Sequence, residues 1–266
     1  MPDPVPDDIA AALARSAERR GCFGDPLYFF AETGSTNDVA AALAERGAPE
    51  GTTVIASRQT AGRGRFGRTW FSPEGAGLYV SLVCRNPEAA PLLTLAGGVA
   101  VAQGIRAACG LPVLIKWPND IVAGEARTRR KLAGILAEAS TGADGLQYVI
   151  LGLGINLRPA AYPPELGDRA TSIETELGRV VDAGLVLSET LAAFHPLFDR
   201  LATGDRGHVL ACWRELAPSS HGALVEWTTP AGERRGTAAG IDDAGALLVK
   251  VGSRIERIIS GELRWH

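Results

Sequence analysis

One stretch of the sequence, TAGRGRFGRTW at residues 60–70, gathers side chains that could hold an anion. Arg63, Arg65 and Arg68 alternate with glycines, and Trp70 follows them. A guanidinium binds a carboxylate or phosphate through two parallel hydrogen bonds, and glycines let the backbone come close to a ligand. The stretch differs from a GxxxxGKS/T phosphate loop and from a GxGxxG loop that leads directly into a helix. It therefore predicts either an anion site or a solvated turn.

Lysine is rare in this chain. Of its 27 Lys and Arg residues only Lys116, Lys131 and Lys250 are lysine. One explanation is compositional bias; the other is that a compact, mobile ammonium is needed beside a phosphate or a reacting carboxylate. Lys116 opens KWPNDI and Lys131 opens KLAGILAE. Asn119 and Asp120 of KWPNDI could bind a metal ion or nucleotide hydroxyls, or could simply form the turn that ends a strand.

Two further motifs are open to two interpretations. GLGIN ends a strand with Gly152 and Gly154, which would let a ligand lie against the sheet or would form a β-bulge. STN at residues 35–37 predicts a helix start, where free amides and hydroxyls can also receive a polar ligand group. The four histidines have no serine and carboxylate partners in a recognisable arrangement, so a Ser/His/Asp triad has no support.

The elements that must position these motifs form a mixed α/β pattern. A short helix begins near STN and ends at Gly47, and residues 52–59 and 77–85 read as strands on either side of the arginine stretch. A long helix follows over residues 91–110. Three more strands are expected at the centre of the sheet, over residues 112–117, 131–139 and 146–157. Residues 184–216 complete the pattern as two helices divided near Gly204.

The last part of the chain has a different pattern. From residue 219 onward, short β-like runs are separated by turns and show no helical period. We therefore expect a first domain over residues 1–218 and a small β-barrel or sandwich domain over residues 219–266.

Composition excludes several classes of protein. The chain has 266 residues, 46% of them hydrophobic, a net charge of -3 and a pI near 5.9, so broad coating of nucleic acid is not expected. Its first ten residues lack a signal-peptide pattern, and Gln103 and Arg106 interrupt the longest apolar run. Four scattered cysteines indicate neither disulfides nor zinc. We expect a cytoplasmic protein without a membrane span.

The ordered set STN, QTAGRGRFGRTWFSPEGAGLYVSL, KWPNDI, KLAGILAE and GLGIN, within residues 30–160, closely resembles the biotin protein ligase family. GTAAGIDDAGALLV resembles the C-terminal domain of that family. The resemblance implies an α+β fold, in which a central mixed β-sheet flanked by helices precedes a small SH3-like β-barrel. It also implies the reaction: with ATP and Mg²⁺, biotin is activated to biotinyl-5′-AMP and then transferred to a lysine of a biotin carboxyl carrier protein, as in acetyl-CoA carboxylase.

The resemblance further implies roles for individual residues. Lys131 and Arg65 would face the biotin carboxylate and the α-phosphate and act in catalysis, while the arginine stretch would close as a lid. Biotin would be bound by Ser35, Thr36, Asn37, Gln59, Gly62, Arg63, Gly64, Arg65, Lys131, Gly134 and Gly152. ATP and the adenylate would be bound by Arg63, Arg68, Trp70, Lys116, Asn119, Asp120 and Asn156, with Asp120 also at the metal.

The sequence departs from the family pattern at two places and leaves alternatives open. Phe66 stands where many relatives have an arginine, and the adenylate segment GDRATSI lacks the aromatic residue that is often present. The competing interpretations are a lipoate or octanoate ligase or transferase of the same fold, and a module whose arginine stretch binds nucleic acid. Only 34 residues precede Ser35, so we expect the ligase without a DNA-binding domain, as a monomer or homodimer.

Overall fold

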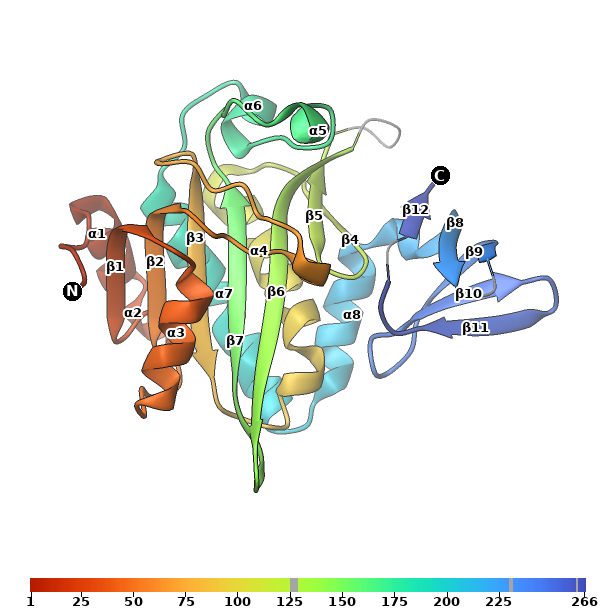
Figure 1. Cartoon of the computed structure of the whole chain (residues 1–266), viewed down its shortest axis with the longest axis horizontal. Helices are drawn as coiled ribbons and strands as arrows, with labels where there is room; N and C mark the ends of the chain where they lie inside the picture. Colours follow the sequence, from red (N-terminus) through yellow and green to blue (C-terminus); the bar gives the residue numbers. More distant parts are fainter. Residues whose placement is uncertain (125–128, 230–231, 262) are drawn as a thin grey trace.

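The computed structural model describes residues 1–124, 129–229, 232–261 and 263–266. A seven-stranded mixed sheet lies at the centre of its larger part, with the order β1-β2-β3-β7-β6-β5-β4 (Figure 1). Only β1 and β2 pair in parallel, and the other neighbours are antiparallel. The strands are β1 (Leu27–Thr33), β2 (Thr53–Gln59), β3 (Gly77–Cys84), β4 (Leu114–Lys116), β5 (Asp120–Ala123), β6 (Arg130–Gly142) and β7 (Gly145–Asn156).

Of the three strands expected at the centre of the sheet, two lie there and one does not. β7 and β6 are central, and most of β7 is buried because strands or helices cover it on every side. The expectation for β4 is wrong, because β4 forms the edge of the sheet. Ile115 of β4 is buried all the same and Leu114 is half-buried, since β4 packs against α4 (Leu93–Cys109), α8 (Arg206–Leu216) and η3 (Pro218–Ser220).

Helices cover both faces of the sheet. α4 lies against β6 and β7, and α7 (Ala183–Ala202) and α8 pack on α4 behind the sheet (Figure 1). α3 (Thr36–Glu45) covers β2, β3 and β7 on the opposite face. The expected division of residues 184–216 into two helices near Gly204 is confirmed. The shorter helices are α1 (Asp7–Arg15), α2 (Ala17–Arg20), η1 (Arg65–Gly67), η2 (Ala90–Leu92), α5 (Pro164–Gly167) and α6 (Ile173–Leu177).

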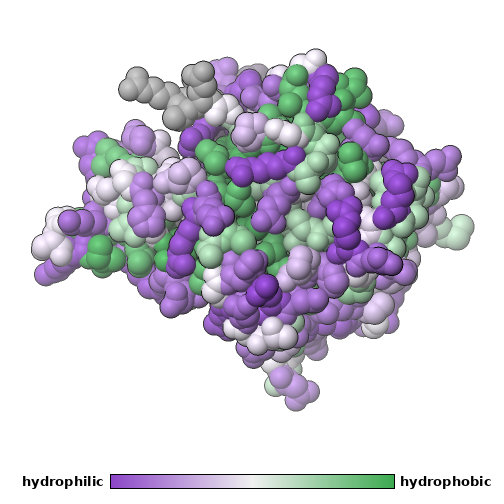
Figure 2. Space-filling model, turned by 180° about the vertical axis from the view of Figure 1, so that it is seen from behind, coloured by the Kyte–Doolittle hydropathy of each residue, from purple (hydrophilic) through white to green (hydrophobic). Residues whose placement is uncertain are grey.

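α4 is apolar enough to be compared with a membrane span. By length and composition alone, the helical stretch Ala90–Cys109 could cross a bilayer, but 67% of its most apolar window is buried inside the protein. A glycine explains how tightly it packs, since a Cβ at Gly104 would lie 2.5 Å from Thr190 Oγ1 of α7. Seen from behind, hydrophobic residues form patches among hydrophilic ones (Figure 2). α4 has the burial of a core helix.

The C-terminal part is an antiparallel sheet with the order β11-β10-β9-β8-β12. Among the residues that the structure describes, no pairing joins β11 to β12, so the expected closed barrel is wrong. The sheet stays open because its edge strands are short and each pairs with one neighbour. The strands are β8 (His221–Thr229), β9 (Gly232–Ile241), β10 (Leu247–Val251), β11 (Arg254–Ile258) and β12 (Leu263–Trp265).

A tight turn docks the C-terminal sheet on the larger part. Asp242 Oδ1 accepts hydrogen bonds from the amides of Ala244 and Ala246, which shapes the turn between β9 and β10. At its tip, the Gly245 carbonyl accepts a hydrogen bond of 2.9 Å from Nε1 of the buried Trp117. Gly245 has a φ of +80° and lies against the side chain of Leu95. One continuous hydrophobic core includes residues of both parts.

Candidate active site

The arginine stretch is a small hairpin that joins β2 to β3 and crosses the front of the sheet (Figure 1). Arg63 pairs with Thr69, and the amide of Trp70 donates to the Gly62 carbonyl over 2.9 Å. The chain reverses at Phe66 and Gly67, whose φ angles are 57° and 72°. Phe66 is a non-glycine residue in the left-handed region and its side chain is 60% exposed. The hairpin therefore has a defined shape and presents an aromatic ring at its tip.

A polar network forms at the start of α3. The backbone amide of Thr36 donates to Gln59 Oε1 over 2.8 Å, and its hydroxyl donates to the same oxygen over 3.0 Å. Gln59 Nε2 donates to Ser72 Oγ, which fixes the orientation of the Gln59 amide. Ser35 is the N-cap residue of α3, although its side chain makes no capping hydrogen bond in the described structure. Three of the expected biotin residues thus meet where α3 begins and β2 ends.

Two residues of this network were missed in the sequence. Ser81 Oγ, fully buried on β3, donates to Asn37 Oδ1 over 2.5 Å and lies 2.8 Å from Thr36 Oγ1. The carboxylate of Glu138 on β6 accepts a hydrogen bond from Asn37 Nδ2. A serine within the otherwise apolar run GLYVSLVC was an available signal, and Glu138 ends the quoted motif KLAGILAE.

Glycines form the floor beneath these groups. A Cβ at Gly152 would lie 2.5 Å from Asn37 Oδ1, and a Cβ at Gly154 would lie 2.6 Å from two atoms of the Trp70 ring. A Cβ at Gly134 would lie 3.0 Å from Trp70 Cζ3. Since no side chain fits at these positions, Asn37 and Trp70 lie directly on the backbone of β6 and β7.

Lys131, Lys116 and Arg65 supply positive charge near the KWPNDI motif. Lys131 Nζ forms an ion pair of 2.6 Å with Asp120 Oδ1 and lies 5.1 Å from the centre of the ring. Burial lowers the pKa of Lys116, an effect that Asp120 opposes and that Lys131, among other cations, strengthens. Burial also lowers the pKa of the Arg65 guanidinium. The site is therefore partly desolvated and holds more positive than negative charge, which suits an anionic ligand.

Arg65 is held by an amide on one side and an aromatic ring on the other. Its Nη1 donates to Asn119 Oδ1 over 3.2 Å, and its guanidinium lies 4.8 Å from the centre of the Phe66 ring. Asn119 Nδ2 donates to the Ile135 carbonyl, so the oxygen of its amide is the atom that faces Arg65.

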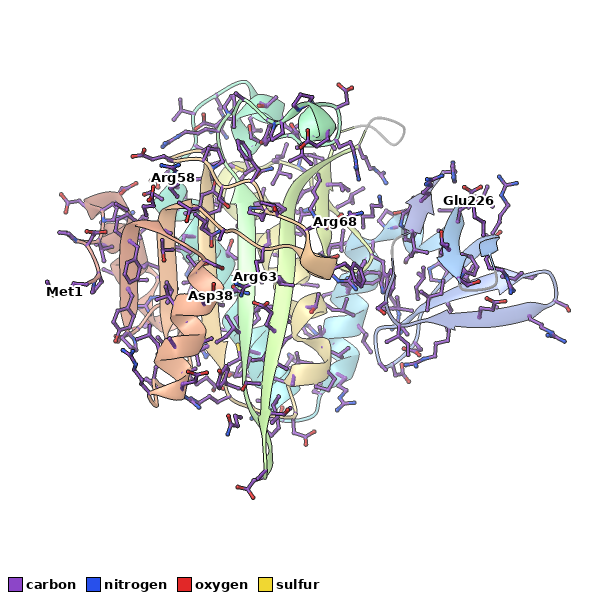
Figure 3. All side chains as sticks on the ribbon, in the orientation of Figure 1. Met1, Asp38, Arg58, Arg63, Arg68 and Glu226 are labelled. Atoms are coloured by element: carbon purple, nitrogen blue, oxygen red, sulfur yellow. The ribbon has the colours of Figure 1, made fainter. Side chains whose placement is uncertain are left out.

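The other two arginines of the hairpin point elsewhere. Arg63 forms ion pairs with Asp38 of α3 and Glu138 of β6, and Figure 3 shows Arg63 and Asp38 side by side. Arg68 is exposed at the far end of the hairpin (Figure 3). The hairpin thus places Arg65 at the cationic end of the site and Arg63 at the polar network.

The segment GDRATSI lies beside Lys131. Lys131 N donates to the Arg169 carbonyl over 2.7 Å, and the Thr171 carbonyl accepts a hydrogen bond from Asn156 Nδ2. The hydroxyl of Tyr162 also donates to the Thr171 carbonyl, and its ring lies 6.1 Å from that of Phe71. Tyr162 therefore places an aromatic ring beside the segment, although the segment itself contains none.

Comparison with known proteins identifies the family. Residues 29–156 match the Biotin/lipoate A/B protein ligase family, and residues 222–263 match the Biotin protein ligase C terminal domain. The chain is 36% identical to the bifunctional ligase/repressor BirA of Bacillus subtilis over 263 residues, which cover 97% of this chain and 79% of BirA. The chain belongs to the biotin protein ligase family. It is also 34% identical to the biotin–acetyl-CoA-carboxylase ligase of Paracoccus denitrificans, covering 83% and 92% of the two chains.

A solved structure of the biotin protein ligase family has the same fold. The biotin protein ligase from Aquifex aeolicus in complex with biotin and ATP superposes with a TM-score of 0.76 at 29% identity, covering 90% of this chain and 98% of that one. The expected family and its α+β fold are confirmed, with the C-terminal sheet open as described above.

Proposed function

We propose that this biotin protein ligase joins biotin to ATP, releases pyrophosphate, and transfers biotin from biotinyl-5′-AMP to a lysine of a biotin carboxyl carrier protein. The observation that carries this proposal is a polar network at the start of α3 beside Trp70, whose ring in turn lies against Lys131 and its partner Asp120. Relatives named as biotin–acetyl-CoA-carboxylase ligases support the carrier of that carboxylase as the acceptor.

The polar pocket suits the head group of biotin. In this proposal Ser35, Thr36, Asn37 and Gln59 bind it, because their hydroxyl and amide groups meet at the start of α3. Gly134 and Gly152 would line this site, where they let Trp70 and Asn37 lie close to the sheet. The hairpin residues Gly62, Arg63, Gly64 and Arg65 then cover the bound molecule.

The cation cluster suits the reacting groups. Both cations contact the KWPNDI motif, Lys131 at Asp120 and Arg65 at Asn119. Their charges would draw the biotin carboxylate and the α-phosphate together and stabilise the negative charge that develops as the carboxylate attacks phosphorus and pyrophosphate leaves. Partial burial strengthens this effect, because the effective dielectric constant is lower than in water.

The remaining motif residues suit the nucleotide. We propose that Arg68, Trp70, Lys116, Asn119, Asp120 and Asn156 bind ATP and the adenylate, next to segment 169–171. Within the described ranges, no three His, Cys, Asp or Glu side chains form a metal cluster. This fits Mg²⁺ that arrives on the triphosphate, for which Asp120 would offer the carboxylate oxygen that is not bonded to Lys131. The ion would neutralise phosphate charge.

The domain limits and cellular location are part of the same proposal. Residues 1–218 would form the catalytic domain and residues 219–266 the C-terminal domain, with the short helix η3 between them. The protein would act in the cytoplasm, where a carboxylase carrier and ATP are available.

The two alternatives make different predictions. The orientation of Arg63 toward Asp38 and Glu138 favours a ligand pocket over a nucleic-acid surface, because two acidic groups already neutralise this arginine. Nucleic-acid binding would weaken steeply with salt. A lipoate or octanoate ligase would leave the polar network at α3 without a partner, since an acyl chain has no hydrogen-bonding group to offer there.

The test is pyrophosphate release from Mg-ATP without carrier protein, with biotin, lipoate and octanoate supplied separately. Release with biotin alone is the expected result. Release with lipoate or octanoate and none with biotin would keep the fold and overturn the substrate. Transfer of labelled biotin to purified carrier domain then tests the second step.

A further inference from the structure

The amide of Asn37 can face its pocket in two ways. Its oxygen and nitrogen occupy similar positions, so a 180° rotation exchanges a hydrogen-bond acceptor for a donor at the same place. Asn37 is 5% exposed, and a Cβ at Gly152 would lie 2.5 Å from its Oδ1 and 3.1 Å from its Nδ2. The atom that lies over the glycine floor therefore decides which ligand group can bind there.

Glu138 removes this ambiguity. An ionised carboxylate accepts hydrogen bonds and cannot donate one, so the Asn37 atom that faces Glu138 must be the Nδ2 donor. Burial would raise the pKa of Glu138, but hydrogen bonds from Arg63 and Asn37 and the Arg63 charge lower it below its ordinary value, which keeps the group ionised at neutral pH. With Nδ2 committed to Glu138, Oδ1 is left over Gly152. Ser81 Oγ lies on one side of this oxygen, which has a second lone pair for a ligand.

The same carboxylate also holds the arginine hairpin. Arg63 donates to Glu138 from Nη2 over 2.9 Å and from Nε over 3.3 Å, while its Nη1 contacts Asp38 at 2.6 Å. The Glu138 side chain is 39% exposed, whereas the Asn37 amide beneath it is buried. Glu138 thus joins the floor of the pocket, the start of α3 and the hairpin at one point.

We propose that Glu138 is the specificity-determining positioning residue of the head-group pocket: it fixes Asn37 Oδ1 as an acceptor over Gly152, so that the pocket selects a ligand that presents an N–H donor. This inference rests on the proposed function. The urea ring of biotin carries two N–H groups, whereas the ends of lipoate and octanoate carry none. A buried acceptor that the ligand leaves without a donor penalises such a ligand strongly, and sites of this kind reject analogues that lack the donor by roughly 10⁴–10⁵-fold.

The experiment compares the wild type with Glu138→Gln and with the double variant Asn37→Asp/Glu138→Gln in the full-length protein. A glutamine can pair with either face of the Asn37 amide, so the single variant loses the fixed orientation. In the double variant, the amide introduced at position 138 can donate to one oxygen of the carboxylate introduced at position 37, and the other oxygen remains an acceptor over Gly152. Glu45→Gln, at the exposed end of α3, is the matched control for the change of charge.

Three ligands are titrated by calorimetry: biotin, biotin methylated on its urea nitrogens, and ATP. We expect Glu138→Gln to weaken biotin binding by roughly tenfold to 100-fold and to reduce the preference for biotin over the methylated analogue. The ATP titration measures the separate effect of the substitution through Arg63, which Glu138 holds. The double variant should recover the preference. If Glu138 had only a structural role, the ratio of the affinities for biotin and for methylated biotin would not change.

Each other outcome overturns the inference. Glu138→Gln that keeps the wild-type preference for biotin over the methylated analogue excludes the positioning role, as does a double variant no better than Glu138→Gln. A wild-type protein that does not bind biotin at all overturns the proposed function itself, and the two failures are therefore distinguishable.

Discussion

Replacing Gly154 with alanine tests whether Trp70 must rest on the sheet. The new methyl group would lie 2.6 Å from Cε2 and Nε1 of Trp70, whereas unstrained carbon contacts lie at about 3.5–4.0 Å. The indole must therefore withdraw by roughly 1 Å. That shift would disturb the contact with Lys131, whose Nζ lies 5.1 Å from the centre of the ring.

The cost of this displacement can be estimated. Adding a methyl group to a tightly packed site costs about 1–3 kcal/mol, which corresponds to roughly 5-fold to 150-fold in affinity. The Trp70 carbonyl accepts a hydrogen bond from Ser72, a partner of Gln59, and its ring contacts Lys131. We therefore expect binding of both biotin and ATP to weaken and pyrophosphate release to fall accordingly. Calorimetric titration of each substrate and a pyrophosphate assay measure the two effects.

Gly98→Ala is the control for this substitution. A Cβ at Gly98, on the core helix α4, would lie 3.7 Å from Ile115, which is an ordinary contact. This variant should keep wild-type activity. If Gly154→Ala binds both substrates and releases pyrophosphate as the wild type does, the close packing of Trp70 on β7 has no part in the site.

Three further variants test other features of the molecule. Lys131→Met should reduce biotin-dependent pyrophosphate release by roughly 10²–10³-fold, because the developing charge loses its counter-charge; near-normal release would remove Lys131 from the catalytic residues. Trp117→Phe should leave the Gly245 carbonyl without a donor and cost about 1–3 kcal/mol more in unfolding free energy than Trp213→Phe, whose buried Nε1 makes no hydrogen bond within the described chain. Burial alone would raise the pKa of Glu138, but its hydrogen bonds with Arg63 and Asn37 outweigh this effect, so the folded pKa lies below the ordinary value. The stabilising contribution of Glu138 is therefore present above the unfolded pKa and is lost as pH falls through the folded pKa. Unfolding of Glu138→Gln should therefore depend less on acid, and a decline as steep as in the wild type would contradict the assignment.

Local sequence patterns were sufficient for most of the helices and strands. β2, β3 and α4 follow from apolar spacing and from flanking glycines, because each signal lies within about 20 residues of chain. The open C-terminal sheet and the edge position of β4 did not follow, because the pairing of distant strands decides them. The stretch DDIAAALARSAERRG at residues 7–21 reads as one short helix in the sequence, but the structure divides it at Ser16, whose side chain bonds to backbone carbonyls of α1.

The site shows the same limit. Its motif residues could be chosen from the resemblance, but the network among Asn37, Ser81 and Glu138 joins three segments that are far apart in the chain. Ser81 and Glu138 each alternate onto the front face of a strand, and only the register of β3, β7 and β6 brings them to α3. Sequence alone therefore pointed to the side chains that we propose as ligand-binding, but not to Ser81 and Glu138, which contact them.

The turn at Gly245 makes the catalytic part and the C-terminal sheet depend on each other for their local structure. Its carbonyl binds Trp117, and Trp117 lies between Lys116 and the cis-proline that leads to Asn119. A chimera that combined this catalytic part with the C-terminal sheet of a distant relative would have to preserve that turn, or the KWPND segment would lose its support. Substitutions at Trp117 and in the turn should therefore be inherited together, and grafting experiments should move them together.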